Sequence, residues 1–477
     1  MKQSSYINIA RDAIRNPVLR KALFGLQDRF GKGTAKGYLE LPEGPELRLL
    51  AHDIRRQTIE NLDDLLALLA ANVRNNGGHV HFALDAETAV RHCLDIAAQH
   101  DVRMAVKGKS MLTEEIGLNP ALESAGVEVV ETDLGEYIIQ LAGENPSHII
   151  APAIHKTRQE ISSLFSEKLG IPKTDDIPTL TLAARKALRK KFLQADMGIS
   201  GCNLACAETG HVTTVSNEGN IRMTTTLPKV YVAFMGMERI VADLRDHQIL
   251  FRLLSLGAAA QKIGGYVSYL GGPGKDTLSA GPREFHLIIV DNGRSRILAD
   301  PEFREMLYCL RCGGCLNVCP VYGEIGGHAY ASAYSGPVGA VVTPLLRGIN
   351  RFADLCQGET LCGACMDACP VNIDLPRMLL LLRNKLAEGD HQWDVHVKNP
   401  LEQFIFGMWS HLVQHPLLYD VALRLARMGQ TLVPKHGQMI SRLPFAEGWT
   451  RSRDLKKIAD QRFIHRYRSL AGRQPHD

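Results

Sequence analysis

Hydrophobic residues recur three and four positions apart over the first 75 residues, most clearly between Leu47 and Leu69, which predicts helices with one buried face. After Gly77-Gly78 the pattern changes to short runs rich in β-branched residues, separated by helix-like stretches such as Thr88–His100. The expected strands are His79–Ala83, Met104–Lys107, Val127–Glu131, His148–Ala151, Val212–Val215, Lys229–Phe234 and His286–Val290. Strands that alternate with helices indicate an α/β domain with a mainly parallel sheet, closing near Arg296.

Charge and hydropathy exclude several functions for this chain of 477 residues. Fifty-five basic residues against fifty-one acidic ones leave a net charge of +4, too small a surplus to predict nucleic-acid binding. There is no run of eighteen apolar residues, so no transmembrane segment is expected, and the first residues lack the apolar core of a signal peptide. We expect a cytoplasmic protein whose cysteines stay reduced.

Eight of the eleven cysteines lie between Cys309 and Cys369. The first motif is Cys309-x2-Cys312-x2-Cys315-x3-Cys319-Pro320, the run of bacterial two-cluster ferredoxins. In that run three thiolates bind one [4Fe-4S] cluster, and the fourth cysteine, which precedes proline, binds the other cluster. A structural zinc site needs only two Cys-x2-Cys pairs, so the third equally spaced cysteine argues against zinc.

The second motif, Cys362-x2-Cys365-x3-Cys369-Pro370, lacks its first cysteine, because residue 359 is Glu359. In two-cluster ferredoxins each motif gives its last cysteine to the other cluster, which we term the crossed rule. The crossed rule predicts one cluster bound by Cys309, Cys312, Cys315 and Cys369, and a second bound by Cys319, Cys362 and Cys365. Cys356 is the expected substitute for the fourth ligand of the second cluster. The alternatives are Glu359 as a non-cysteine ligand or an open iron, with Cys356 an incidental buried thiol. An open iron could bind substrate.

These patterns divide the chain into four expected regions. They are a helical N-terminal segment (1–76), the α/β domain (77–297), an α-helical ferredoxin-type domain with two clusters (298–398) and a helical C-terminal region (399–477).

Polar residues of the α/β domain supply weak candidates for chemistry. Glu208-Thr-Gly210 and Asn217-Glu218-Gly-Asn220 flank a short β-run, with Arg222 nearby. Arg222 could bind a carboxylate while Glu208 or Glu218 acts as a general base. Alternatively, Glu218 and Arg222 simply pair with each other. The segment Lys107–Ser110 follows a strand and could bind an anion, although a helix cap at Ser110 explains it more simply.

The motifs resemble those of the lactate-utilisation iron–sulfur protein B family. The matching segments, which run over nearly the whole chain, include Gly198-Ile-Ser-Gly-Cys-Asn-Leu-Ala, Asn217-Glu-Gly-Asn-Ile-Arg222, Gly281-Pro-Arg-Glu-Phe-His286, Asp291-Asn-Gly-Arg294, Ile325-Gly-Gly-His-Ala-Tyr330 and Leu361-Cys-Gly-Ala-Cys365. The resemblance implies a sugar-isomerase or CoA-transferase-like sheet and two [4Fe-4S] clusters in a bacterial L-lactate oxidation system. It also implies two partners, a cysteine-rich subunit resembling heterodisulfide reductase and a smaller subunit that shares the α/β domain.

Three functional hypotheses follow. The first is an iron–sulfur subunit that relays electrons in a multi-subunit complex oxidising L-lactate to pyruvate, in the cytoplasm or peripheral to the inner face of the membrane. The second is a catalytic subunit that binds the hydroxy acid in the α/β pocket or at an incompletely ligated cluster. The third is a redox or metabolite sensor. No dinucleotide or flavin motif is recognisable, and oxidation of a hydroxy acid removes two electrons while each cluster normally passes one. The sequence therefore favours the relay.

Overall fold

The computed structural model of the chain describes residues 6–274, 281–396, 400–432, 435–436, 439–443, 450, 453–461 and 463–471. The chain divides into two compact units, Met1–His396 and Val397–Asp477. The first unit contains both the α/β sheet and the eight clustered cysteines.

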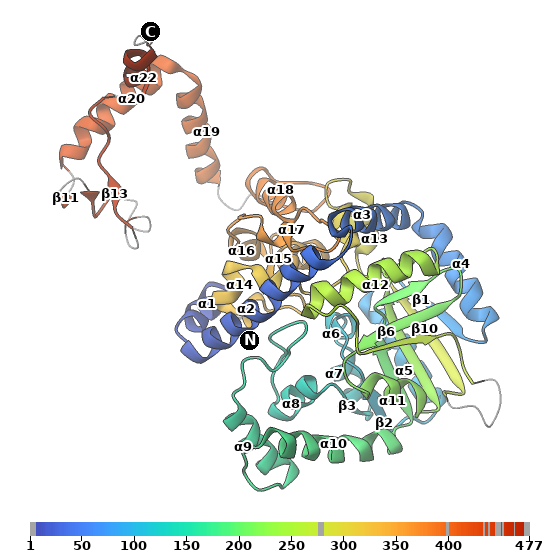
Figure 1. Cartoon of the computed structure of the whole chain (residues 1–477). Helices are drawn as coiled ribbons and strands as arrows, with labels where there is room; N and C mark the ends of the chain where they lie inside the picture. The colour runs from blue at the N-terminus through green and yellow to red at the C-terminus, as the bar shows by residue number, and fades with distance from the viewer. Residues whose placement is uncertain are drawn as a thin grey trace. The chain divides into compact units, whose positions relative to one another are not determined.

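A six-stranded parallel sheet forms the centre of the first unit (Figure 1). Its strands lie in the order β1-β10-β7-β4-β2-β3, with bounds β1 (His79–Ala83), β10 (Glu284–Val290), β7 (Val230–Gly236), β4 (Met197–Gly201), β2 (Met104–Lys107) and β3 (Glu128–Glu131). Every residue of β7 is buried. A strand covered on both faces needs this nearly continuous apolar sequence.

Helices connect and cover these strands. Their bounds are α5 (Ala86–Gln99), α6 (Met111–Glu115), α7 (Leu118–Ser124), α8 (Leu134–Ala142), α9 (Arg158–Leu169), α10 (Ile177–Gln194), α11 (Asn220–Thr226), α12 (Leu244–Ala259) and α13 (Arg294–Ala299). Four of them begin at an aspartate, Asp85, Asp133, Asp176 or Asp243, whose carboxylate accepts a hydrogen bond from the backbone N–H three residues later. Such caps satisfy amides that have no partner within the helix.

A smaller four-stranded sheet lies in the order β8-β5-β6-β9. Its strands are β5 (Leu204–Cys206), β6 (His211–Ser216), β8 (Ile240–Val241) and β9 (Tyr266–Leu270). Helix α12 packs beside this sheet. Its residue His247 is buried, and Nε2 of His247 lies 2.9 Å from Oγ1 of Thr213 on β6.

Four helices precede the sheet: α1 (Tyr6–Ile14), α2 (Pro17–Glu40), α3 (Gly44–Glu60) and α4 (Leu62–Asn75). Helix α2 begins at Asn16, which caps it, and buries Leu19, Leu23 and Leu26. On the same helix, Gln27 donates hydrogen bonds to the carbonyl oxygens of Leu316 (3.0 Å) and Cys319 (2.8 Å). The N-terminal helices therefore pack against the cysteine region.

The cysteine region consists of short helices joined by tight turns. Their bounds are η1 (Arg304–Tyr308), η2 (Leu316–Val318), α14 (Pro320–Ile325), η3 (His328–Tyr330), α15 (Gly336–Arg347), α16 (Ala353–Gln357), α17 (Ala364–Asp367) and α18 (Leu375–Glu388), where η marks a 3₁₀ helix. Their buried side chains form one apolar cluster that also takes in residues of α2, α3 and α12. This shared core explains why the α/β part and the cysteine region form one unit.

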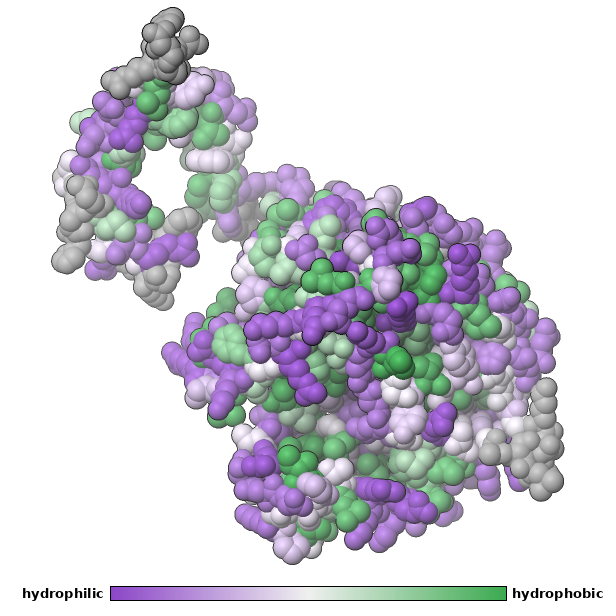
Figure 2. Space-filling view, in the orientation of Figure 1, coloured by the Kyte–Doolittle hydropathy of each residue, from purple (hydrophilic) through white to green (hydrophobic). Residues whose placement is uncertain are grey.

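The second unit contains α19 (Pro400–Gln414), α20 (Pro416–Gly429), η4 (Gln430–Leu432), β11 (Lys435–His436), β12 (Met439–Ile440), β13 (Leu455–Lys456) and α22 (Phe463–Ala471). Large apolar side chains of α19 are exposed, among them Phe404 (62%) and Trp409 (58%). In the view of Figure 2, hydrophobic and hydrophilic residues are interspersed over both units. Among the described helices, none has the length and hydropathy needed to cross a membrane.

The structure confirms the predicted α/β domain with a parallel sheet, and the predicted bounds of β1 and β2 coincide with the observed ones. The prediction of a strand over His148–Ala151 is wrong, because bends and turns occupy this segment. Three hydrogen bonds are found there instead of strand pairing. Nδ1 of His148 accepts hydrogen bonds from the amides of Ile150 and Ala151, and Tyr322 Oη donates to the carbonyl of Ser147 (2.8 Å).

Candidate functional site: two cysteine sites and an adjoining cavity

The loop around Cys312 adopts a conformation that aims backbone amides at sulfur. Arg311 and Gly313, on either side of Cys312, both have positive φ (57° and 77°). The amide of Arg311 donates to Sγ of Cys309 (3.3 Å), and that of Gly314 donates to Sγ of Cys312 (3.4 Å). Such N–H···S contacts stabilise negative charge on sulfur, as a thiolate-bound metal centre requires.

Four thiols lie together in what we term the first cysteine site: Cys309, Cys312, Cys315 and Cys369. Burial and the neighbouring thiols of Cys369 and Cys309 raise the pKa of Cys312, and burial raises the pKa of Cys369 to about 12, with Cys309 adding to the shift. Buried thiols with raised pKa values lose their protons when a metal binds. The donor set fits a [4Fe-4S] cluster, and the assignment of these four cysteines to one cluster stays a prediction.

The N-terminal helices hold the Cys369 end of this site. Arg48 on α3 donates to the carbonyl oxygen of Cys369 from Nε (3.1 Å) and from Nη2 (2.7 Å). Its guanidinium lies 5.0 Å from the ring centre of Tyr38, whose pKa is raised by burial and by the thiol of Cys312. A cation and a phenol thus border the first cysteine site.

The second cysteine site contains Cys319, Cys362, Cys365 and Glu359, which line one small recess beside α15 and α18. Oε2 of Glu359 lies 3.4 Å from Sγ of Cys319. Burial and the Glu359 carboxylate raise the pKa of Cys365 to about 12. Three thiols and one carboxylate are a donor set that iron accepts.

Cys356, the expected fourth ligand, has a different position. It lies on α16 and is fully buried, with Sγ 3.8 Å from the carbonyl oxygen of Phe352 and 4.0 Å from that of Ala340. It is absent from the described residues that line the recess. The structure therefore brings Glu359, rather than Cys356, among the three cysteines.

Two buried arginines connect the first cysteine site to the α/β part. Arg239, which follows β7, donates to the carbonyl oxygens of Cys309 (2.7 Å) and Leu310 (2.9 Å). Arg55 on α3 donates to Ile240 (2.7 Å) and Leu307 (2.9 Å). A buried guanidinium must have its donors satisfied, and here main-chain carbonyls on both sides satisfy them.

A cavity of about 460 Å³ lies between the sheet and the first cysteine site. Its walls include Gly201 and Gly236 at the carboxyl ends of β4 and β7, residues of α12, and Arg311 and Cys312. Ligands of α/β sheets usually bind at the carboxyl ends of strands. The cavity therefore has the usual position of a ligand site and also reaches a cysteine of the first site.

A closed ring of buried polar contacts forms part of the cavity wall. Arg294 binds both oxygens of Glu115 (2.9 Å each), and its Nε lies 2.8 Å from Oε2 of Glu238. Arg311 Nη2 lies 3.8 Å from Oε1 of Glu238, with its guanidinium over the ring of Tyr334 (4.4 Å), and Tyr334 Oη donates to Glu115. Burial alone would raise the pKa of Glu238, but Arg294 and Arg311 hold it below its usual value. The ring keeps Arg311 charged beside the first cysteine site.

Four polar atoms of the cavity-lining residues are buried without a hydrogen-bond partner. Two of them, Nε of Arg294 and Oε2 of Glu238, form the ion pair described above, and the other two are Nη1 of Arg311 and Oγ1 of Thr214. Buried polar groups of proteins normally have a partner. Glu218 also lines the cavity, and burial together with the Asp133 carboxylate raises its pKa to about 7. A cation, a hydroxyl and a carboxyl group that titrates near neutrality can together bind and deprotonate a small acid.

The three residues proposed from the sequence are not brought together. Glu218 lines the cavity, but its Oε2 accepts a hydrogen bond from the amide of Leu134 (3.3 Å) and does not pair with Arg222. Arg222 is exposed, with its guanidinium 5.5 Å from the ring centre of Tyr266. Glu208 accepts from the amide of Leu244 at the start of α12 (3.3 Å). The contacts of the described residues thus give these three side chains separate partners, and a catalytic role for Glu208, Glu218 or Arg222 stays a prediction.

The segment after β2 serves two purposes. Ser110 caps α6 by accepting from the amide of Thr113, as expected, and Lys109 and Ser110 also line the cavity. Lys107 is fully buried and pairs with Glu131 (2.8 Å).

Sequence reasoning gave no chemical role to Glu238, Arg239 and Arg311. One signal was available, because Glu238-Arg239 follows almost directly the fully apolar strand β7, where a parallel sheet places its ligand groups. Arg311 carried no such signal, since its role depends on the fold of the cysteine loop.

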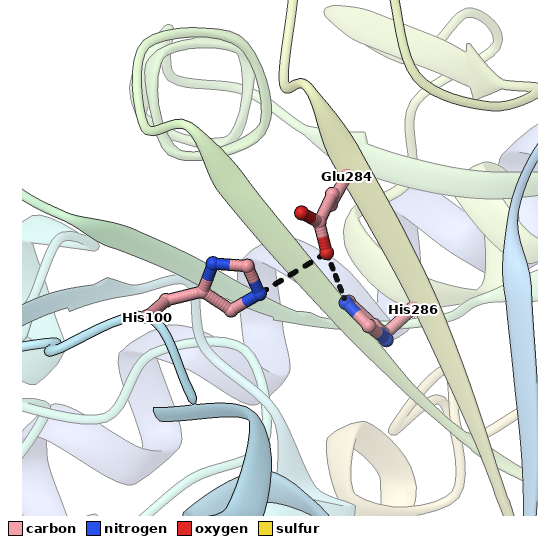
Figure 3. Close-up of side chains that lie close together, drawn as sticks. All are labelled: His100, Glu284 and His286. Atoms are coloured by element: carbon pink, nitrogen blue, oxygen red, sulfur yellow. Dashed lines mark ion pairs between the residues drawn. The ribbon is translucent and has the colours of Figure 1, made fainter. Parts of the chain in front are cut away.

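A separate group of histidines lies at the amino end of β10, away from the cavity at the carboxyl ends of the strands (Figure 3). Oε2 of Glu284 lies 3.1 Å from Nε2 of His100 and 3.4 Å from Nε2 of His286. Nδ1 of His286 lies 3.1 Å from Nε2 of His81. The side chains of His100, Glu284 and His286 are near enough to one another to hold a metal ion. Burial and the neighbouring imidazoles lower the pKa of His286 to about 4, so the ring is neutral at pH 7 and pairs through hydrogen bonds.

Sequence profiles match three parts of the chain. They are the LUD domain over residues 66–290, the 4Fe-4S dicluster domain over residues 305–373, and the C-terminal domain of lactate utilisation protein B over residues 395–470. The dicluster match covers both cysteine sites, so the chain carries [4Fe-4S] clusters, two in number.

Relatives match over almost the whole chain. An uncharacterised electron transport protein of Escherichia coli, YkgF, is 42% identical over 95% of this chain and 94% of its own length. Lactate utilization protein B of Bacillus licheniformis is 43% identical with the same coverage. A solved DUF162 family protein of Deinococcus radiodurans is 12% identical, covers 48% of this chain and 98% of its own, and has a TM-score of 0.28. At this identity and coverage, the chain belongs to the lactate utilisation protein B family.

Proposed function

We propose that this chain is the iron–sulfur electron-transfer subunit of a multi-subunit complex that oxidises L-lactate to pyruvate. The observation that carries the proposal is the presence of two cysteine sites within one compact unit. The names of the relatives, lactate utilization protein B and an electron transport protein, support it. When bound, each [4Fe-4S] cluster supplies one-electron transfer.

We assign the ligands by the crossed rule. Cys309, Cys312, Cys315 and Cys369 bind one cluster, and Cys319, Cys362 and Cys365 supply three ligands of the other, within an α-helical ferredoxin-type fold. The electrostatic effects of Cys369 and Cys309 on Cys312, and of Cys309 on Cys369, support the first assignment, although sixty residues separate Cys309 from Cys369 in the sequence.

The partners are those that the family resemblance implies, and the stoichiometry of the reaction gives them a role. Oxidation of a 2-hydroxy acid releases two electrons and two protons, so a centre that accepts the electron pair must precede one-electron carriers. The expected cysteine-rich subunit and smaller α/β subunit are the candidates for that centre. The proposal keeps the cytoplasmic location expected from the sequence, because reduced thiols are needed to bind the clusters.

Anaerobic visible absorbance of the cluster-loaded chain tests the relay. L-lactate should leave the absorbance of the lone chain unchanged and bleach it once both partners are added. Iron and sulfide, assayed on the same sample, should give about eight irons per chain. Full iron content without bleaching in either mixture would refute the lactate assignment.

A second candidate function is direct catalysis in this chain, and the cavity beside Cys312 favours it. Arg311 would bind the substrate carboxylate, and Glu218 would accept the hydroxyl proton. The volume of about 460 Å³ lies within the range of pockets for drug-sized molecules, so a three-carbon acid would fill only part of it. Because the cavity is larger than lactate requires, we prefer electron relay to direct catalysis as the function of this chain.

The two candidates differ in the behaviour of the lone chain. Bleaching by L-lactate alone, abolished by Arg311→Met and retained by Arg222→Met, would establish catalysis here. Arg222 is a matched control because it is an exposed arginine outside the cavity.

A further inference from the structure

Glu359 occupies the place in the second cysteine loop that Cys309 occupies in the first. Each residue lies three positions before the next cysteine, Cys312 or Cys362. The backbones agree as well, because Leu361 and Gly363 on either side of Cys362 have φ values of 58° and 86°, close to the 57° and 77° of Arg311 and Gly313. Equivalent loops present equivalent positions to the metal, so position 359 is a ligand position by geometry.

The side chain of Glu359 is directed into the second cysteine site. Its Oε2 lies 3.4 Å from Sγ of Cys319, and it lines the recess together with Cys362 and Cys365. The other oxygen, Oε1, accepts a hydrogen bond from Tyr330 Oη at 2.8 Å. Tyr330 is 1% exposed, so this phenol is held firmly by its surroundings. One carboxylate oxygen is therefore oriented by the protein while the other faces the cysteines.

The charge of Glu359 also calls for a cation. The residue is 9% exposed, and among the described residues its carboxylate contacts Cys319 and Tyr330, neither of which is a cation. Arg383 is near, but its Nη2 donates to the backbone carbonyl of Glu359 (2.7 Å) and its Nε to that of Cys356 (2.7 Å). A buried carboxylate without a cationic partner is unfavourable, and a bound iron would compensate its charge.

Cys356 does not share the position of Glu359 at the second cysteine site. Its Sγ lies toward the carbonyl oxygens of Phe352 and Ala340, inside the packing between α15 and α16. Arg383 anchors its backbone at the same time. The thiol of Cys356 is thus held within the packing of α15 and α16 and is absent from the described residues that line the recess.

We propose that Glu359 is the fourth protein ligand of the second [4Fe-4S] cluster, and that Tyr330 positions its carboxylate. The inference rests on the cofactor and on the ligand assignment of Cys319, Cys362 and Cys365, and is independent of lactate. Carboxylate oxygen is a harder and more exchangeable ligand for iron than thiolate. The iron next to Glu359 is then chemically distinct from the other irons of the two clusters.

Mössbauer spectra of the full chain, reconstituted anaerobically with an enriched iron isotope, test this directly. The wild-type chain should show one iron per chain with the larger isomer shift of an oxygen-ligated site. Glu359→Cys should remove that component and keep full iron content. Cys356→Ser should leave both unchanged and is the matched control, since it alters a buried cysteine of the same segment.

Mild oxidation followed by EPR gives a second measurement. Glu359→Ala should lose one iron per chain and yield the signal of a [3Fe-4S] cluster at lower oxidant than wild type, whereas Glu359→Cys should resist. Tyr330→Phe should retain all irons but broaden the distinct Mössbauer component, because Oε1 loses its donor. A wild-type spectrum without a distinct iron, or loss of one iron in Cys356→Ser with none lost in Glu359→Ala, would overturn the proposal.

Discussion

Arg239 donates a hydrogen bond of 2.7 Å to the carbonyl oxygen of Cys309, so a side chain of the α/β part holds the first ligand position of the first cysteine site. The same guanidinium donates to Leu310 at 2.9 Å. The loop that binds the cofactor is thus positioned from outside its own segment.

Replacing Arg239 by methionine should therefore weaken the first cluster. Loss of charged hydrogen bonds to buried carbonyls costs at least about 2 kcal/mol, which corresponds to roughly thirtyfold faster removal of that cluster's iron by a chelator. Chelator-induced bleaching measures this. The control is Arg222→Met, which removes an exposed arginine and should match wild type. Equal rates for Arg239→Met and wild type would show that the loop keeps its position without this contact.

Gly236 at the end of β7 should not tolerate a side chain. A Cβ atom there would lie 2.3 Å from Oε2 of Glu238 and 2.8 Å from Nε of Arg294, which would separate this buried ion pair. Breaking such a pair costs about 3–5 kcal/mol, so Gly236→Ala should lower the thermal midpoint strongly. Gly219→Ala, with nothing within 4 Å of the added Cβ, should change stability by no more than about 0.5 kcal/mol. Similar thermal midpoints for the two variants would contradict the close packing of Gly236 against the Glu238–Arg294 ion pair.

Two buried histidines should make stability fall as the pH decreases from 6.5 toward 4, against an opposite contribution from the buried carboxyl groups of Glu218 and Glu136, whose pKa values are raised. Burial lowers the pKa of His247 to about 4 and that of His148 to about 3, from an ordinary value of 6.5. Between these values the unfolded chain binds protons that the folded chain does not, so acid favours unfolding. Thermal melts across this range measure the slope.

His247→Gln isolates one contribution to that slope. The difference in stability between variant and wild type should shrink as the pH falls from 6.5 toward 4, because only the wild type loses the benefit of a neutral buried imidazole. Acid damage to the clusters affects both proteins and cancels in the difference. A pH-independent difference would mean that His247 titrates alike in both states.

The crossed ligand assignment predicts which cysteine variants share an effect. Cys309→Ser and Cys369→Ser should each remove one cluster, about four irons, and the double variant should lose no more, because both residues bind the same cluster. Combining Cys369→Ser with Cys365→Ser should remove about eight irons. Iron assays give the result. Additive loss in the first pair would show that the ligands are not crossed.

Local patterns predicted β1 and β2 to the residue because turn signals bound each short apolar run. The same reasoning failed at His148–Ala151, where Ile149 and Ile150 resemble a strand. These residues instead line the cavity, and their side chains lie against Gly313 of the first cysteine loop. A tertiary contact with a loop more than 160 residues away leaves no local signature.

Cysteine spacing within each of the two motifs predicts where the cysteine sites lie, whereas the exchange of the last cysteine between the motifs joins ligands that are far apart in sequence and stays a prediction. The cavity could not be predicted in this way. Its polar ring takes Glu115, Glu238, Arg294, Arg311 and Tyr334 from five separate segments, and only the packing of the sheet against the cysteine region brings them together. The division of the first unit into a helical segment, an α/β domain and a ferredoxin-type domain stays a prediction.

Arg55 has a consequence for the order of events during synthesis. It lies on α3, and its Nε donates to Tyr308, 253 residues further along the chain. A ribosome that has finished α3 must therefore add most of the α/β part and the start of the cysteine region before this buried guanidinium has its partners. Contacts over such separations close late in folding. The loop of the first cysteine site therefore gains this contact only after all six strands of the parallel sheet have been translated.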